Sequence, residues 1–182
     1  STFLIYSSDA ISWSQASTTI GGGPVEWNGA YFLVGGPVNG GATNIATSTD
    51  GINWTLSSVA SNDAAFSICT DGNTVIFNTG ANIYYSTNQG ASWTAVSPTV
   101  FSGVVKVSYQ NNKFLAIGTN NNYIAYSFNH TTWYTSSSNI LSAVPQCFSK
   151  VYNNKQINVG NGINIYTDYT QDGVNTFTFS RV

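Results

Sequence analysis

The chain has 182 residues, and only 7% of them are charged, compared with roughly 25% in an average soluble domain. The formal net charge is −2, and the five basic residues, which all lie between residues 106 and 181, form no cluster in the sequence. Phosphate groups are bound by clustered Lys and Arg, so this pattern argues against a nucleic-acid partner and against an anionic membrane surface. No apolar run approaches the ~20 residues that span a bilayer, so we expect no membrane insertion.

A short polar segment recurs five times along the chain. The copies are YSSDAISW (6–13), TSTDGINW (47–54), YSTNQGASW (85–93), YSFNHTTW (126–133) and the longer YTDYTQDGVNTF (166–177). Consecutive tryptophans of the first four copies are 41, 39 and 40 residues apart. A second element, a turn followed by an apolar run, starts at Asn28, Asp71, Asn111 and Asn153 and keeps a similar spacing. Two signals with one period indicate a true structural repeat.

Each repeat unit predicts four short antiparallel strands. In the second unit we expect strands over residues 24–28, 31–35, 44–48 and 53–59. The turns between them contain Asn28-Gly29 and Asp50-Gly51, which favour two-residue hairpin turns. The runs between turns are rich in Val, Ile, Tyr, Phe and Thr, and no window shows a helical period. Four strands every ~40 residues are typical of the blades of an all-β propeller.

The repeat count predicts one propeller domain over residues 1–182, with about five blades. We expect a half blade at 1–18 and four-stranded blades at about 22–59, 63–99, 103–139 and 143–182. This pattern predicts a compact ring whose first blade is short. The last unit carries its own outer strands, however, so the chain could instead be part of a larger propeller. An oligomer that forms through the incomplete blade is a further alternative.

The recurring segments resemble the Asp-box, Ser-x-Asp-x-Gly-x-x-Trp, of the bacterial-neuraminidase repeats found in sialidases and other propellers. Residues 47–54 fit best, because Ser, Asp, Gly and Trp are all present, with Gly51 directly after Asp50, whereas Ala10 and His130 replace the glycine in two other copies. The resemblance implies a structural hairpin on the outer rim, away from the usual ligand face. The corresponding residues are Ser7, Asp9, Trp13, Ser48, Asp50, Gly51, Trp54, Ser86, Asn88, Gly90, Trp93, Ser127, Asn129, Trp133, Asp172, Gly173 and Phe177.

The residues needed for glycoside chemistry are missing from the sequence. Sialidases bind the substrate carboxylate with three arginines, but this chain has only Arg181. Glu26 is the only glutamate, and no carboxylate pair suited to another glycosidase is evident. His130, the only histidine, is predicted to be an exposed turn residue. The acids of residues 168–173 are too few for a calcium loop. We therefore expect no catalytic residues, no metal site and no cofactor.

Four aromatic residues outside the repeated segment are candidates for ligand binding. They are Trp27, Tyr109, Tyr123 and Tyr152, which could stack on sugar rings, although such residues more often serve in packing. The two cysteines could form one disulfide at most, or remain two buried thiols.

The repeat also resembles those of phage tail and giant-virus proteins. YFLVGGPVNGGATNIATSTDGINWT (31–55) and KFLAIGTNNNYIAYSFNHTTW (113–133) carry this likeness. It implies a non-enzymatic structural or attachment module at an extracellular or virion surface. One alternative is a lectin-like propeller that binds a neutral glycan. The other is a scaffold that binds another protein chain through the open strand edge of the half blade.

Overall fold

The computed structural model describes the chain in segments separated by short gaps. The described residues are 4–18, 20, 22–37, 43–59, 65–80, 82–96, 104–110, 112–118, 124–135, 148–152, 155–159, 165–169 and 178–181. Every regular element among them is a β-strand, and each strand pairs antiparallel with its sequence neighbour within one sheet. The prediction of an all-β fold built from four-stranded sheets is confirmed.

Five sheets follow one another along the chain. The half-sheet consists of β1 (Ile5–Tyr6) and β2 (Ser14–Gln15). The first sheet contains β3 (Val25–Trp27), β4 (Phe32–Pro37), β5 (Thr43–Ser48) and β6 (Thr55–Ser58). The second contains β7 (Ser67–Thr70), β8 (Val75–Asn78), β9 (Ile83–Ser86) and β10 (Thr94–Ala95). The third contains β11 (Val104–Gln110), β12 (Lys113–Gly118), β13 (Ile124–Ser127) and β14 (Tyr134–Thr135). The fourth contains β15 (Phe148–Tyr152), β16 (Lys155–Val159), β17 (Ile165–Tyr169) and β18 (Thr178–Arg181).

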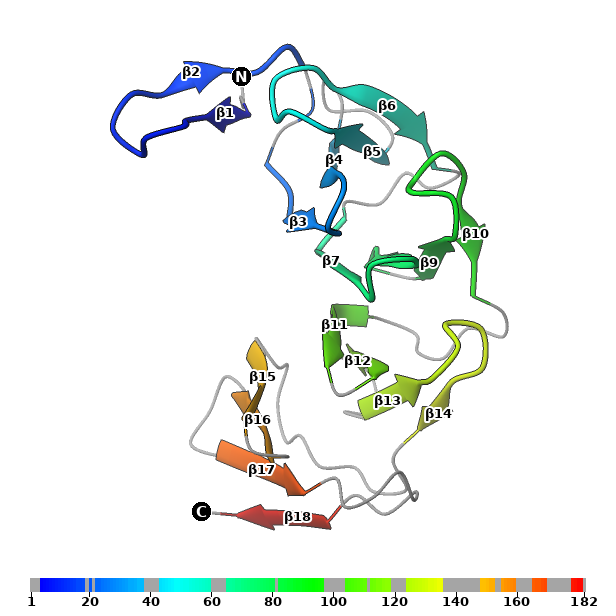
Figure 1. Ribbon diagram of the computed structural model, residues 1–182. Helices are drawn as coiled ribbons and strands as arrows, with labels where there is room; N and C mark the ends of the chain where they lie inside the picture. The colour runs from blue at the N-terminus through cyan, green and yellow to red at the C-terminus, as the bar shows by residue number, and fades with distance from the viewer. Residues whose placement is uncertain are drawn as a thin grey trace.

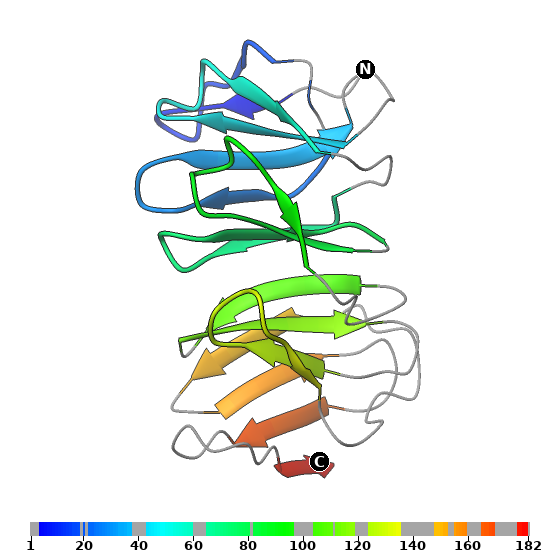
Figure 2. The ribbon, with the colours of Figure 1, turned by 90° about the vertical axis from the view of Figure 1, so that its right-hand side faces the viewer.

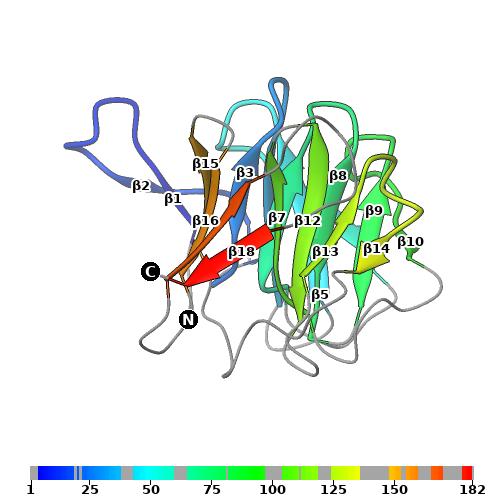
Figure 3. The same ribbon diagram turned by 90° about the horizontal axis from the view of Figure 1, so that it is seen from below.

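The sheets stand side by side along an open arc (Figure 1). The first strand of each four-stranded sheet lies on the concave side, and the last strand lies farther out (Figure 1). The turns within the hairpins gather at one end of the sheets (Figure 2). The half-sheet projects from one end of the arc, whereas β15–β18 form the other end (Figures 1 and 3). We predicted a compact ring, but the described arc stays open. The physical reason is that β15–β18 already form a complete sheet, which has no strands to lend to β1–β2.

Apolar clusters join the half-sheet to the first sheet, the first sheet to the second, and the second to the third. Between the half-sheet and the first sheet lie Leu4, Ile20, Val34, Ala46 and Trp54. Leu33, Ile45, Ile68, Val75 and Phe77 lie between the first and second sheets, and Cys69, Ile76, Val107, Phe114 and Ala116 lie between the second and third. The first and second sheets therefore each have two apolar faces, which is why their strands read as nearly continuous apolar runs.

Hydrogen bonds add a second type of link between neighbouring sheets. The Ser17 hydroxyl donates to the Ile52 carbonyl at 2.8 Å, and the Ser57 hydroxyl donates to the Ala91 carbonyl at 3.3 Å. Ile52 and Ala91 both stand two residues before the tryptophan of a rim hairpin. The half-sheet is therefore attached to the first sheet in much the same way as the first sheet is attached to the second.

Candidate functional site

The hairpin between β5 and β6 is closed by a network around Asp50. Its Oδ1 accepts hydrogen bonds from the Ile52 and Asn53 backbone N–H groups, both at 2.8 Å. The Ser48 hydroxyl donates to the same carboxylate at 2.9 Å, and the Asn53 side chain donates to its other oxygen at 2.9 Å. Hydrogen bonds from the backbone and side chain of Asn53, and then from Ile52 and Ser48, stabilise the ionised carboxylate. The pKa of Asp50 therefore lies well below its usual range.

Three other rim hairpins repeat this network with small changes. Asp9 accepts from the N–H groups of Ile11 at 2.8 Å and Ser12 at 2.7 Å. In the hairpins where an amide replaces the carboxylate, Asn88 Oδ1 accepts from Ser92 N–H at 3.0 Å, and Asn129 Oδ1 accepts from Thr132 N–H at 2.8 Å. The serine two residues earlier donates to the same side chain in each hairpin, from Ser7, Ser86 and Ser127. An acceptor oxygen, and not a negative charge, is what these turns share.

The turn that follows each of these side chains contains a residue with positive φ. In chain order these residues are Ala10, Gly51, Gln89 with Gly90, and His130. Trp54 and Trp133 each donate their indole N–H to the carbonyl of that residue, Gly51 or His130, at 3.0 Å. In the hairpin of residues 86–93, Gln89 is inserted between Asn88 and Gly90, and the indole N–H of Trp93 is buried without a partner among the described residues. Trp93 therefore lacks the indole hydrogen bond that Trp54 and Trp133 make within their turns.

These observations place the Asp and Asn side chains in turns, where their oxygens are occupied by backbone donors. Residues 172, 173 and 177 of the last predicted copy lie outside the described residues. Whether the hairpins belong to the Asp-box family stays a prediction.

His130 differs from the expectation of an exposed turn residue. Its ring lies 4.7 Å from the ring of Tyr85, which belongs to the neighbouring second sheet. The imidazole is half-buried, and this burial lowers its pKa, although the nearby Asp71 carboxylate acts in the opposite direction. The repeat spacing could not reveal this contact, because it joins two different sheets.

The structure places two of the four aromatic candidates in equivalent positions. Trp27 and Tyr109 are each paired across the strands with a phenylalanine, Phe32 or Phe114, just before the first turn of a sheet. The ring centroids are 4.5 Å apart in the first pair and 4.8 Å in the second, with interplanar angles of 48° and 49°. Tyr109 also packs against the cluster between the second and third sheets, and burial raises its pKa.

Trp27 is the candidate whose side chain is the more exposed, at 45%. Tyr123 lies outside the described residues, and Tyr152 ends β15, where the structure describes the backbone. The two candidates whose side chains are described, Trp27 and Tyr109, lie on different sheets and do not form a shared site.

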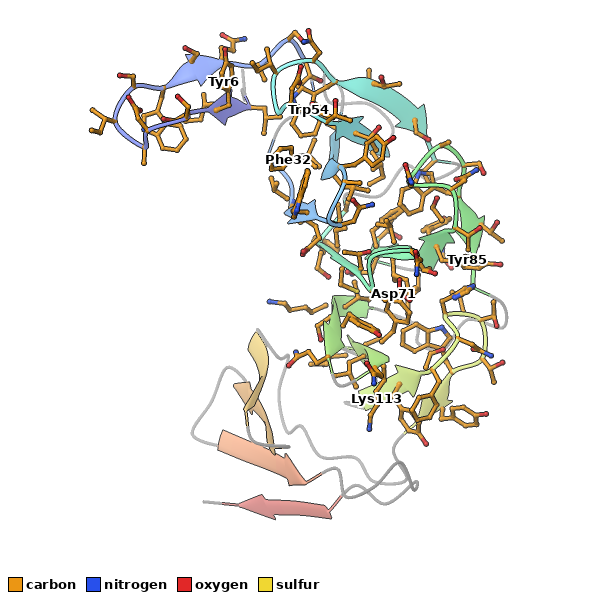
Figure 4. The ribbon with its side chains drawn as sticks, in the orientation of Figure 1. Tyr6, Phe32, Trp54, Asp71, Tyr85 and Lys113 are labelled. Atoms are coloured by element: carbon orange, nitrogen blue, oxygen red, sulfur yellow. The ribbon has the colours of Figure 1, made fainter. Side chains whose placement is uncertain are left out.

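Val25, an exposed apolar residue two positions before Trp27, is not among the candidates that we chose from the sequence. Val25 pairs with Val34, Ile68 with Phe77 and Val107 with Ala116 at the same register. The exposed fractions of Val25, Ile68 and Val107 are 56%, 6% and 1%. Ile68 and Val107 are covered by the preceding sheet, whereas the described half-sheet in front of Val25 consists of β1 and β2 alone and leaves Val25 uncovered. Phe32 and Trp54, which are labelled in Figure 4, lie on the face of the first sheet that is turned toward the half-sheet.

The half-sheet itself has an uncovered outer face. Ile5 is 54% exposed, whereas Ala46 at the equivalent register of the first sheet is fully buried. Trp13 is 57% exposed, but its counterpart Trp54 packs in the cluster behind the half-sheet. Together with Val25 and Trp27, these side chains make one end of the arc rich in exposed apolar surface.

The described residues offer few groups for chemistry. They contain no cluster of three or more His, Cys, Asp or Glu that could hold a metal ion. Cys69 is a free buried thiol, whose pKa is raised well above its usual range by burial and by the nearby Glu26 and Asp71. Cys147 lies outside the described part of the chain. Nor does the described part contain a helix whose length and apolar character would let it cross a membrane.

Neither a protein-family model nor a curated protein matches the sequence. Solved structures with similar folds include virginiamycin B lyase from Staphylococcus aureus, with a TM-score of 0.72 and 15% identity over 97% of this chain and 61% of that one. YCF48 bound to D1 peptide has a TM-score of 0.64 and 14% identity over 92% of this chain and 55% of that one. The WD40 β-propeller domain of Doa1 has a TM-score of 0.58 and 15% identity over 84% of this chain and 54% of that one. The chain thus spans little more than half the length of these proteins, and the likeness establishes that its fold is that of a β-propeller.

Proposed function

We propose that the chain is a non-enzymatic propeller module with a structural or attachment role at an extracellular or virion surface. The observation that carries the proposal is the concentration of exposed apolar side chains at one end of the arc. Of the ten large hydrophobic side chains that are exposed among the described residues, five lie within the first 27 positions: Ile5, Ile11, Trp13, Val25 and Trp27. Exposed apolar clusters of this kind commonly mark interaction surfaces.

The hydrogen bonds of the Asp carboxylates support a non-enzymatic role. Asp9, Asp50 and Asp71 each accept backbone N–H groups of their own turn, so their lone pairs are engaged in holding hairpins. Glu26 lies half-buried on β3. The resemblance to repeats of phage tail and giant-virus proteins, together with the low charge, supports the surface location.

A protein partner fits this surface better than a glycan. The exposed side chains Ile5 and Val25 are aliphatic and offer no hydrogen bonds to sugar hydroxyls. YCF48, one of the structural neighbours, is bound to a D1 peptide, which gives an example of a peptide held by a propeller of similar fold. The lectin-like alternative rests on Trp27, whose half-exposed ring could stack on a sugar.

Two assays test this proposal. We expect the purified chain to leave a panel of fluorogenic glycosides, including a sialoside, unhydrolysed. Turnover that disappears in Glu26→Gln would overturn the non-enzymatic role. A glycan array provides the second assay: hits that are lost in Trp27→Ala would favour the lectin-like alternative, and an array without hits would favour a protein partner.

A further inference from the structure

The rim hairpin of the third sheet differs from the other three described rim hairpins in two side chains. It carries Phe128 directly after the hairpin serine, and Tyr134 directly after the tryptophan. The other three carry a serine or a threonine at both positions: Ser8, Thr49 and Thr87 at the first, and Ser14, Thr55 and Thr94 at the second. Aromatic rings thus replace two small hydroxyl side chains in this hairpin.

Phe128 and Tyr134 form a continuous aromatic ladder with Tyr126, which lies between them. The Tyr126 ring is stacked on Tyr134 at a centroid distance of 5.3 Å, and it meets Phe128 nearly at right angles at 5.6 Å. Tyr126 is buried, and it occupies the position of Tyr85, whose ring contacts the next sheet. Phe128 and Tyr134 are 51% and 48% exposed, so the two outer rings offer apolar surface to a ligand.

A lysine stands at one end of the aromatic ladder. Lys113 begins β12, and its Nζ atom lies 5.8 Å from the centroid of the Phe128 ring. Phe114 and Ala116 on β12 pack toward the second sheet, so the alternation of the strand places Lys113 on the opposite face, together with Tyr126. Lys113 is labelled in Figure 4. The ladder therefore combines two exposed rings with one positive charge.

The distribution of charge along the chain favours a negatively charged ligand at the ladder. Five of the seven acidic residues precede residue 72, whereas all five basic residues follow residue 105. Residues 104–135, which contain the third sheet, include two lysines and no acidic residue. A carboxylate that approaches the ladder is therefore attracted by Lys113 and meets no acidic side chain of the same sheet. Two separate lysines are too few for a polyphosphate chain, which needs clustered cations.

We propose that the aromatic ladder and Lys113 bind an acidic saccharide whose negative charge is a carboxylate, as in a chain of uronic acids. The exposed rings of Phe128 and Tyr134 stack on the apolar C–H faces of the sugar rings, and the Lys113 ammonium pairs with a carboxylate. Thr131 and Thr132 are exposed in the same hairpin, and their hydroxyls suit the hydroxyls of a sugar. This inference goes beyond the proposed function, because it concerns a different surface and a different class of ligand.

An NMR titration of the full chain with oligogalacturonate tests the proposal directly. We expect chemical-shift changes at residues 113, 126–128 and 134. The matched ligand control is the fully methyl-esterified oligogalacturonate, which keeps the sugar rings but has no charge. We expect it to bind at least about fivefold more weakly, because a charge-assisted contact is lost. Added salt should weaken the binding of the charged form only.

Substitutions in the full chain locate the site. Phe128→Thr and Tyr134→Thr introduce the residues that the first sheet carries at these positions, and we expect each to weaken binding of oligogalacturonate by about fivefold. Lys113→Gln should reduce the affinity to that of the methyl ester and remove the salt dependence. Lys106→Gln is the matched charge control, because Lys106 lies on β11, seven residues before Lys113. We expect its affinity to stay within about twofold of the original.

The two threonine variants also show whether the chain itself covers the ladder. Because exposed rings add little to stability, each variant should keep the midpoint of thermal unfolding within about 2 °C of the original. A loss of more than about 6 °C, together with no ligand-induced shifts in the unmodified chain, would show that the ladder is packed within the protein. That result would overturn the proposal. The titration of the unmodified chain remains decisive if a variant does not fold.

The outcomes distinguish the classes of ligand. Shifts at the ladder that require the carboxylate, weaken in the ladder variants and persist in Lys106→Gln support the proposal. Absence of shifts at about 10 mM oligogalacturonate overturns it, and so does equal binding of the methyl ester. A poly-glutamate peptide that binds the same residues as tightly would overturn it in favour of an acidic protein partner.

A last outcome separates the ladder from the lectin-like alternative at the end of the arc. Shifts at Trp27 that disappear in Trp27→Ala, with none at the ladder, would overturn the proposal in favour of that alternative. Binding at the ladder that persists in Trp27→Ala supports a separate site. The glycoside assays test the non-enzymatic role independently of these results.

Discussion

The half-sheet and the second sheet contain the same hairpin in two different settings. In both, a side-chain oxygen accepts turn N–H groups and a serine donates to the same side chain, from Ser7 to Asp9 and from Ser86 to Asn88. Trp93 packs against the cluster between the first and second sheets, whereas Trp13 is largely exposed. The hairpin forms from contacts within one short segment, but burial of its tryptophan requires a neighbouring sheet.

The same contrast separates the inner strands. Val25 and Trp27 on β3 are equivalent to Val107 and Tyr109 on β11, yet they are exposed, because the described half-sheet in front of them consists of β1 and β2 alone. Local sequence therefore determines the hairpin and the strand register, whereas the environment of each face depends on the next sheet along the arc.

The largest expected difference between the two regions concerns the equivalent positions of Val107 and Val25. We expect Val107→Glu to lower the free energy of unfolding by about 3–5 kcal/mol, because it buries an unpaired carboxylate between two sheets. Val25→Glu should change it by less than about 0.5 kcal/mol, because that position faces solvent. Urea denaturation of both variants gives the comparison. Equal losses would show that Val25 is covered in solution.

A smaller effect is expected from the glycine of the rim turn in the second sheet. Gly90 has a φ of +86°, and a Cβ atom there would lie 3.0 Å from Thr47 Cγ2 and 3.3 Å from Trp93 Cζ2. Gly90→Ala should therefore cost about 2–3 kcal/mol, from the backbone conformation and from crowding.

Gly51→Ala is the matched control for Gly90→Ala. At Gly51 the nearest atom to a Cβ is 3.8 Å away, on Phe32, so only the conformational cost of about 1 kcal/mol remains. Chemical denaturation ranks the two variants. A loss at Gly51 as large as that at Gly90 would contradict the role of crowding.

The half-sheet offers the reverse substitution. Ala10 has a φ of 58° at the position that Gly51 occupies in the first sheet. We expect Ala10→Gly to stabilise the hairpin by about 0.5 kcal/mol, because relief of the left-handed conformation exceeds the added chain entropy. Hydrogen exchange of the residue 11 and 12 amides measures the change. Faster exchange in the variant would refute it.

The smallest expected effect is that of low pH. It should weaken the turn hydrogen bonds in hairpins closed by an Asp carboxylate, but not in hairpins closed by an Asn amide. Hydrogen bonds from Ser12, Ile11 and Ser7 lower the pKa of Asp9 from 3.8 to about 2. Because the folded pKa is depressed, the stabilisation is fully present above the unfolded value and is lost as the pH falls through the folded value. Between about pH 4 and pH 1, the residue 11 and 12 amide resonances should shift as the bonds weaken.

The amide hairpins are the internal control for this titration. The Ser92 and Thr132 amides, which are bonded to Asn88 and Asn129, should not follow the same transition, since an amide does not titrate there. Asp9→Asn should remove the transition at residues 11 and 12 while the turn persists. Parallel shifts in all hairpins would instead indicate global unfolding.

The sequence was sufficient to predict the fold class and most of the strands. Predicted strands at 31–35 and 44–48 correspond to β4 and β5, because turn residues and apolar runs mark them locally. The exposure of Val25 could not be predicted in this way, because its neighbours Val34 and Phe32 read like those of a buried strand. The contact of His130 with Tyr85 was missed for a related reason, since it depends on how two sheets approach.

The simple order of strands within each sheet has a consequence for how the chain folds. Every ladder joins consecutive segments, so no strand must wait for a distant partner before it pairs. The contact order within a sheet is therefore low for a β-protein, and folding can begin in any one sheet and spread to its neighbours. Such a chain can gain or lose a whole unit of four strands without changing the pairing inside the others.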